Sequence, residues 1–280
     1  MTATEVQAAK AQRFLSLHHR DEPLLMPNAW DQGSAKILGS LGFEALATTS
    51  SGFAATLGRP DGAVTRDEAL AHAATMVAAT DRPVSADLEN CFADDPAGVA
   101  ETVRLALDAG LAGCSIEDFT GHADQAIYDA GLAAERVAAA VEAAHAGPVH
   151  LVVTARAENY LHGRPNLDDT IGRLRSFEES GADVLYAPGL RALDEIRQLI
   201  AAVERPVNVL VLPGGPTVAE LADVGVRRIS VGGALAFAAL GALVDAANEL
   251  RERGTYGYGE RARTGRQAAL AAFSSGAGDS

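Results

Sequence analysis

Acidic side chains stand at the ends of three short apolar segments, and they are the clearest chemical feature of the sequence. Asp87 and Glu89 close the third such segment, Glu117 closes the fourth, and Glu158 follows the fifth. If these segments are neighbouring parallel strands, about 4.8 Å apart, their carboxylates converge on one small volume. Carboxylates at such short distances repel one another unless a cation lies among them. Oxygen ligands without cysteine or histidine favour a hard divalent ion, so we expect Asp87, Glu89 and Glu117 to hold Mg²⁺ or Mn²⁺.

Residues suited to binding an anion follow neighbouring segments. Arg156 comes directly after the fifth segment, and its guanidinium fork suits a carboxylate or a phosphate. Ser50, Ser51 and Gly52 follow the second segment and offer hydroxyl and backbone N–H groups that can hold either anion. A second interpretation of the acids is that they cap helices, because carboxylates stabilise the positive end of a helix, and we prefer this interpretation for Asp118.

The spacing of the segments predicts the scaffold that positions these residues. Apolar runs of five to seven residues alternate with Ala-rich helical stretches, at about 35 residues per unit. Such runs are typical of buried parallel strands, and eight βα units predict a (β/α)8 TIM barrel. The rival is an open doubly wound sheet, but no G-x-G-x-x-G motif follows the first strand. The expected strands are 23–27, 43–49, 83–87, 111–117, 149–155, 182–187, 206–212 and 226–231, and the expected helices are 31–41, 66–80, 96–109, 129–146, 168–180, 191–204, 217–224 and 233–253.

Two parts of the chain are expected: a barrel over 1–253 and a C-terminal extension over 254–280. The extension is expected to form a helix over 260–273 and to be disordered at its end.

In a barrel, active sites lie at the carboxyl ends of the strands. Asn208, in the seventh strand, is therefore of interest, whereas Asp61 lies in a Gly-Arg-Pro-Asp-Gly stretch where an aspartate commonly serves the turn itself.

Composition excludes several classes of function. The net charge of −14 disfavours nucleic acid and anionic membrane as partners, because the field of the protein repels polyanions. Two cysteines are too few for a disulfide scaffold or a multi-cysteine metal site. Neither a long apolar stretch nor a signal-peptide pattern is present, so we expect a cytoplasmic protein.

Four motifs in register resemble those of the isocitrate lyase/phosphoenolpyruvate mutase superfamily. They are MPNAWDQGSAKILGSLGFEALATTSSGFAATLGRPDG, PVSADLEN, GCSIED and VVTARAEN, within a resemblance that spans roughly residues 14–250. The resemblance implies a Mg²⁺-dependent barrel acting on 2-oxo or 2-hydroxy carboxylates. The resemblance implies that Ser51 and Gly52 form the substrate-carboxylate loop and that Asp61 is an active-site aspartate. It implies that the metal ligands are Asp87, Glu89 and Glu117. The substrate-binding residues that it implies are Arg156, Glu158 and Asn208.

The loop after the fourth strand departs from this family. Lyase members carry a Lys-Lys/Arg-Cys-Gly-His motif whose cysteine is the acid–base group, and mutase members carry a Lys-Thr-Asn-Ser-like loop. Residues 119–125 here read FTGHADQ, without cysteine or lysine. His122 is the one imidazole in that stretch and is the local candidate for proton transfer, the alternative being a solvent-facing loop histidine.

The resulting hypothesis is a metal-dependent lyase that acts through an enolate held on the metal, with C–C cleavage favoured. Oxaloacetate-type decarboxylation and C–P chemistry of the phosphonopyruvate or phosphoenolpyruvate type are alternatives. A non-catalytic carboxylate-binding barrel is a further alternative. The expected partner is a small carboxylate, and the resemblance also implies a homodimer or homotetramer built through the C-terminal helix.

Overall fold

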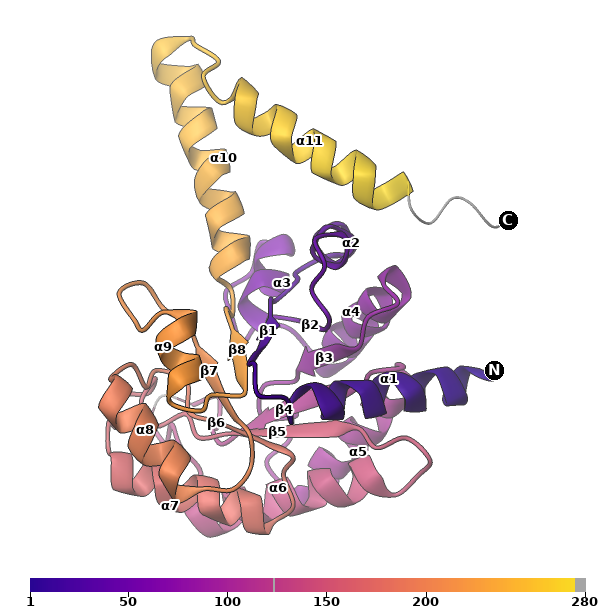
Figure 1. Ribbon diagram of the computed structural model, residues 1–280, viewed down its shortest axis with the longest axis vertical. Helices are drawn as coiled ribbons and strands as arrows, with labels where there is room; N and C mark the ends of the chain where they lie inside the picture. The colour runs from indigo at the N-terminus through magenta and orange to yellow at the C-terminus, as the bar shows by residue number, and fades with distance from the viewer. Residues whose placement is uncertain (123, 275–280) are drawn as a thin grey trace.

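Eight parallel strands form the centre of the fold in the residues that the computed structural model describes, which are 1–122 and 124–274 (Figure 1). They pair in the order β1-β8-β7-β6-β5-β4-β3-β2. An isolated parallel bridge between Asn28 and Ala47 joins the two ends of this order, so the barrel is nearly closed. The predicted (β/α)8 barrel is confirmed. The strands are β1 Leu24–Met26, β2 Leu46–Ala47, β3 Val84–Asp87, β4 Gly113–Glu117, β5 Val152–Arg156, β6 Val184–Tyr186, β7 Val207–Leu210 and β8 Arg228–Ser230.

Helices surround the strands, and their amphipathic faces bury the main core against the sheet (Figure 1). Start signals in the sequence set several of them. Thr65 and Glu68 form a capping box at the start of α4, and Asp95 caps α5 ahead of Pro96. The helices in the described residues are α1 Ala3–Leu17, α2 Gln32–Ser40, α3 Ser50–Thr56, α4 Arg66–Ala79, α5 Pro96–Asp108, α6 Ala130–His145, α7 Leu167–Glu179, α8 Leu193–Ala202, α9 Val218–Asp223, α10 Ala234–Arg253 and α11 Gly259–Ser274.

Helix α1 covers the end of the barrel where the strands begin, and the sequence pattern did not predict it. A capping box between Thr2 and Glu5 starts this helix. Phe14 is fully buried and packs in a second core cluster with side chains from the first residues of several strands. Gly113 at the start of β4 allows this approach, because a Cβ atom there would lie 2.7 Å from Phe14 Cε1 and 2.9 Å from the Val152 carbonyl oxygen.

Two further differences from the expected elements concern the first βα units. The second strand is far shorter than the expected 43–49, since only Leu46 and Ala47 pair regularly with β3. Ser50–Gly52, expected as a loop, form the first turn of α3, because the Thr49 hydroxyl accepts a hydrogen bond from Gly52 N and caps that helix.

The last two helices extend away from the barrel (Figure 1). Helix α10 ends at Gly254, whose φ of +63° suits a left-handed C-cap, and α11 then turns back to pack against α2. Several apolar side chains of α10 are exposed, among them Phe237, Leu243 and Val244. The expected disordered end falls largely on 275–280, which lie outside the described residues. In the described ranges, none of the helices has the length and apolar character that crossing a membrane requires.

Candidate active site

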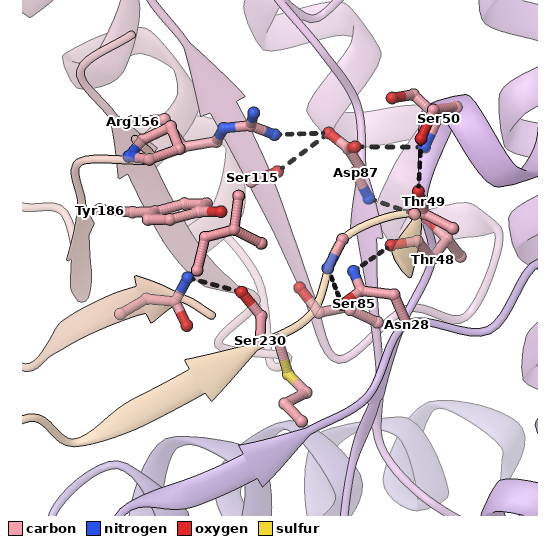
Figure 2. A pocket seen from close by; sticks show the side chains of 18 of the residues that line it. Asn28, Thr48, Thr49, Ser50, Ser85, Asp87, Ser115, Arg156, Tyr186 and Ser230 are labelled. Atoms are coloured by element: carbon pink, nitrogen blue, oxygen red, sulfur yellow. Dashed lines mark hydrogen bonds and ion pairs between the residues drawn. The ribbon is translucent and has the colours of Figure 1, made fainter. Parts of the chain in front are cut away.

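A cavity of about 180 Å³ opens at the carboxyl end of the strands and continues into the barrel (Figure 2). Its upper part, nearest the carboxyl ends of the strands, contains acids and hydroxyls. Its lower part, deeper in the barrel, contains residues from β6, β7 and β8. The polar and charged side chains that line it include Asn28, Ser50, Ser51, Asp61, Asp87, Ser115, Arg156, Tyr186, Asn208, Arg228 and Ser230.

Asp87 stands at the centre of the upper part. Its carboxylate accepts hydrogen bonds from Ser50 N at 3.2 Å and from Arg156 Nη1 at 2.9 Å (Figure 2). Ser115 Oγ lies 3.5 Å from the same carboxylate, and the backbone N–H of Asp87 donates to Thr48 Oγ1. These contacts, from Thr48 and Ser50 after β2, from Ser115 of β4 and from Arg156 of β5, fix the Asp87 side chain toward the cavity.

Arg156 joins three carboxylates at the ends of three neighbouring strands. Its nitrogen atoms lie 2.9 Å from Asp87 Oδ1, 3.1 Å from Glu117 Oε2 and 2.7 Å from Glu158 Oε1. Burial acts to lower the pKa of this guanidinium, but Glu158, Glu117 and Asp87 outweigh it and raise the pKa above its ordinary value. The predicted convergence of these acids is therefore present, with Arg156 as their shared counter-charge.

Negative charge in this cluster exceeds what Arg156 can balance. Burial raises the pKa of Glu117, and burial followed by repulsion from Asp87 and Asp61 raises the pKa of Glu89 to about 7. No donor among the described residues lies within hydrogen-bond distance of the Glu89 carboxylate. An all-oxygen set with an unpartnered, half-buried carboxylate fits a hard divalent cation such as Mg²⁺.

The turn that carries Glu89 has unusual backbone geometry. Glu89, Cys91 and Phe92 all have φ between +50° and +59°, a region that non-glycine residues adopt at a cost. Buried Arg136 of α6 stabilises this turn by donating to the carbonyl oxygens of Asn90, Ala93 and Asp94 at 2.6–3.1 Å. Arg136 thus acts on the site indirectly, by fixing the turn that follows β3.

The lower part of the cavity contains a charged residue that the sequence analysis missed. Arg228, at the start of β8, is 3% exposed and donates from Nε to Asn208 Oδ1 at 3.0 Å. Asn208 in turn donates to Ser230 Oγ at 2.9 Å. Two consecutive arginines, Arg227 and Arg228, inside the eighth expected strand were the available signal, because a charge in a buried strand needs a structural or functional partner.

The predicted site residues fall into two groups. Most of them line the cavity or touch a residue that does, as Glu158 does from its buried position behind Arg156. The backbone N–H of Gly52 already donates to Thr49, and that of Ser50 already donates to Asp87. His122 is exposed and is not part of the cavity lining. Asp118 is no helix cap, since it accepts from Glu158 N at 2.7 Å and pairs with Arg173.

A separate group of possible metal ligands lies at the opposite end of the barrel. His145, His150 and Asp183 have ligand atoms within 4.8 Å of one another. Both imidazoles already contact the Asp183 carboxylate, at 3.3 and 2.9 Å, and their rings stack with centroids 3.8 Å apart. Because Asp183 precedes β6, this group is distinct from the acids around Asp87.

Comparisons with known proteins match nearly the whole barrel. The model of a family described as phosphoenolpyruvate phosphomutase matches residues 14–251. One similar crystal structure is that of a Burkholderia cenocepacia J2315 protein, whose assignment as a lyase/mutase is itself provisional. Its sequence is 53% identical to this chain, its fold matches with a TM-score of 0.89, and the match covers 91% of this chain and 92% of that chain. An uncharacterised protein of Mycobacterium tuberculosis is 35% identical over 78% of this chain and 81% of its own length. The 2-methylisocitrate lyase of Bacillus subtilis strain 168 is 28% identical over 78% of this chain and 72% of its own length.

Proposed function

Because the chain belongs to the isocitrate lyase/phosphoenolpyruvate mutase superfamily of Mg²⁺-dependent lyases and mutases, we propose that it cleaves a C–C bond in a 2-oxo or 2-hydroxy carboxylate. The chain is an enzyme of this lyase superfamily; the reaction and its substrate are the proposal. The observation that carries it is the group of acids around Arg156 at the mouth of the cavity.

Asp87, Glu89 and Glu117 are the residues that would hold the metal. Mg²⁺ supplies Lewis-acid polarisation of a substrate oxygen, which favours negative charge at that atom. Asp87 is the principal ligand in this proposal, because it lines the cavity while Glu117 is buried behind it. Mg²⁺ usually keeps several waters, so Glu89 and Glu117 can act partly through water.

The chain's own residues would bind and orient the substrate carboxylate. Arg156 presents its guanidinium to the cavity, Ser50 lies on the opposite side of Asp87 (Figure 2), and Ser51 also lines the cavity. Positive charge and hydroxyl donors fixed before the substrate binds stabilise charge that develops in the transition state.

Asp61 is better placed than His122 to transfer a proton. Asp61 lines the cavity, whereas the His122 side chain is exposed outside it. We therefore expect Asp61→Asn to slow turnover by about 10²-fold, the loss typical for a general acid or base, and His122→Asn to remain within about twofold of wild type. The reverse result would return proton transfer to His122.

The direct test of the proposed function is a screen for product release. Di- and tricarboxylates with a 2-oxo or 2-hydroxy group are incubated with protein and Mg²⁺, and pyruvate, glyoxylate and CO₂ are measured. Glyoxylate or pyruvate without CO₂ supports C–C cleavage of the lyase type, and CO₂ supports the decarboxylase alternative. Asp87→Ala should lower turnover by about 10³-fold without unfolding the chain, because it also removes carboxylate repulsion.

A matched control and a second assay make this test decisive. Exposed Asp81→Ala removes the same side chain far from the cavity and should leave turnover unchanged. Deuterium exchange into bound pyruvate reports enolate chemistry even when the natural substrate is absent from the screen. If wild type shows neither exchange nor product release, the non-catalytic carboxylate-binding alternative replaces the proposal.

Assembly through the C-terminal helices belongs to the same proposal. The exposed Phe237, Leu243 and Val244 of α10 form an apolar surface that a second copy of the chain would cover, in a homodimer or homotetramer. Light scattering at micromolar concentration tests this, and a monomer contradicts it.

A further inference from the structure

Arg228 carries a buried positive charge that no acid compensates. In the part of the chain that the structure describes, no carboxylate oxygen lies within 4.0 Å of its guanidinium. Burial, and repulsion from Arg156 as a smaller cause, lower the pKa of Arg228 to about 9, so the side chain is still protonated at neutral pH. A buried charge without a counter-ion is costly, and in proteins such charges are normally paired.

The groups around Arg228 are neutral hydrogen-bond partners. Nε donates to Asn208, and Nη1 donates to Thr154 Oγ1 at 2.9 Å and faces His18 Nε2 at 3.4 Å. Burial and the positive charge of Arg228 lower the pKa of His18 to about 3, and burial raises the pKa of Tyr186 to about 12, so both stay uncharged. Nη2 has no acceptor among the described residues.

Arg228 forms the floor of the same cavity whose mouth holds the acid cluster. Strand pairing places Arg156, Tyr186, Asn208 and Arg228 in register on four successive strands, from β5 to β8. Arg228 is two residues before Ser230, the last residue of β8, and therefore lies about 7 Å deeper along that strand. Asp87 and Arg228 line the same cavity, so a ligand with its reacting end near Asp87 would extend its other end toward this guanidinium.

We propose that Arg228 determines specificity by binding a second anionic group of the substrate, so that the cavity takes 2-oxo or 2-hydroxy acids with a distal carboxylate in preference to monocarboxylates. Asn208 orients the guanidinium through its Oδ1, and Ser230 fixes the Asn208 amide in turn. A ligand carboxylate would supply the missing counter-charge and accept from Nη2. This inference deepens the proposed function, since it rests on the same cavity, but it can be tested by binding alone.

The test compares two ligands that differ only in their distal group. Malate and 2-hydroxybutyrate have the same four-carbon chain, and malate has a carboxylate where 2-hydroxybutyrate has a methyl group. Their affinities are measured by isothermal titration calorimetry with Mg²⁺ present, for wild type, Arg228→Met and Arg227→Met. The pair 2-hydroxyglutarate and 2-hydroxyvalerate repeats the comparison with one more carbon, because the depth of the cavity sets the best length.

Wild type is expected to bind the dicarboxylate of at least one pair about 10- to 100-fold more tightly than its monocarboxylate partner. Arg228→Met should abolish that preference and leave the monocarboxylate affinity within about threefold of its wild-type value. Arg227→Met removes the same charge from the neighbouring residue, whose side chain donates to the Arg20 and Asp21 carbonyls, and should keep the preference.

Melting temperatures separate a ligand-binding role from a structural one. If Arg228 serves the ligand, the ligand-free Arg228→Met protein melts at or above the wild-type temperature, because an uncompensated buried charge has been removed. A lower melting temperature with an unchanged ligand preference assigns Arg228 to the fold and overturns the proposal. So does a wild type without preference in either pair. Failure of the product screen alone contradicts the lyase chemistry but not this binding result.

Discussion

His18 offers a quantitative test of how the floor of the barrel is built. This side chain ends α1, is 1% exposed and contacts Phe14 O through Nδ1 at 2.8 Å and Arg228 through Nε2. Burial, with the positive charge of Arg228, lowers its pKa from 6.5 to about 3. The unfolded chain therefore binds one more proton than the folded chain between these pH values, and the free energy of unfolding falls as the pH falls below 6.5.

The size of this effect follows from the two pKa values. Between pH 8 and pH 4, proton binding to unfolded His18 lowers the free energy of unfolding by about 3 kcal/mol. His18→Gln keeps a donor for Phe14 O but cannot bind this proton. Urea unfolding of metal-free protein at several pH values should show wild type losing about 3 kcal/mol more than the variant over this range, because titration of all other groups cancels in the difference.

The control is His19→Gln, which removes an exposed imidazole one residue further along. Its unfolding free energy is measured over the same pH range, so that loss of an exposed ring is compared with loss of a buried one. Parallel curves for wild type and His18→Gln would show that the ring is protonated in the folded chain, which would refute the neutral contact with Arg228.

Three further outcomes follow from the packing and charges of the site. Gly113→Ala should lower the free energy of unfolding by about 1–3 kcal/mol, because the new Cβ would overlap Phe14 and a carbonyl oxygen. Gly172→Ala in α7, where the space around the Cβ position is open, should raise the free energy of unfolding by about 0.5–1 kcal/mol. Equal urea midpoints for the two variants would contradict this. Arg136→Met should lower the free energy of unfolding by about 2–5 kcal/mol and weaken Mg²⁺ binding in calorimetry, since the turn after β3 loses three hydrogen bonds; unchanged Mg²⁺ affinity would show that this arginine does not support the site. Mg²⁺ affinity should rise between pH 6 and pH 8, because Glu89, with its pKa raised to about 7, must lose its proton to bind the ion; Glu89→Gln should flatten this rise, and an equally steep rise in that variant would remove Glu89 from the ligand set.

The strands and the acid cluster could be predicted because local pattern and topology act together there. Continuous apolar runs such as 149–155 indicate strands buried on both faces, and parallel order brings the carboxyl ends of all strands to one edge. The position of Asp87 and Glu117 beside Arg156 followed from that order alone. Strand length did not, because pairing in β2 depends on where the neighbouring strands stop.

Features that depend on distant residues could not be predicted in this way. The left-handed φ of Glu89 and Cys91 is maintained partly by Arg136 from a helix more than 40 residues later. The role of Arg228 could not be predicted, because it depends on the side chain lining the cavity and on His18 lying beside it, and the two residues are far apart in the sequence. The Ala-rich pattern of helix α1 is also typical of a solvent-facing terminus. Only the folded barrel shows that Phe14 packs against the end where the strands begin.

The contact between His18 and Arg228 also sets when the cavity can exist during synthesis. It joins residues 210 positions apart, and β1 must pair with β8 in the same step. A chain emerging from the ribosome can therefore form its middle βα units early, but the floor of the cavity is completed only after about four-fifths of the residues have been made. Phe14 can pack earlier, because the other members of its cluster extend no further along the chain than Val184, whereas His18 lacks its neighbour Arg228 until β8 has been made.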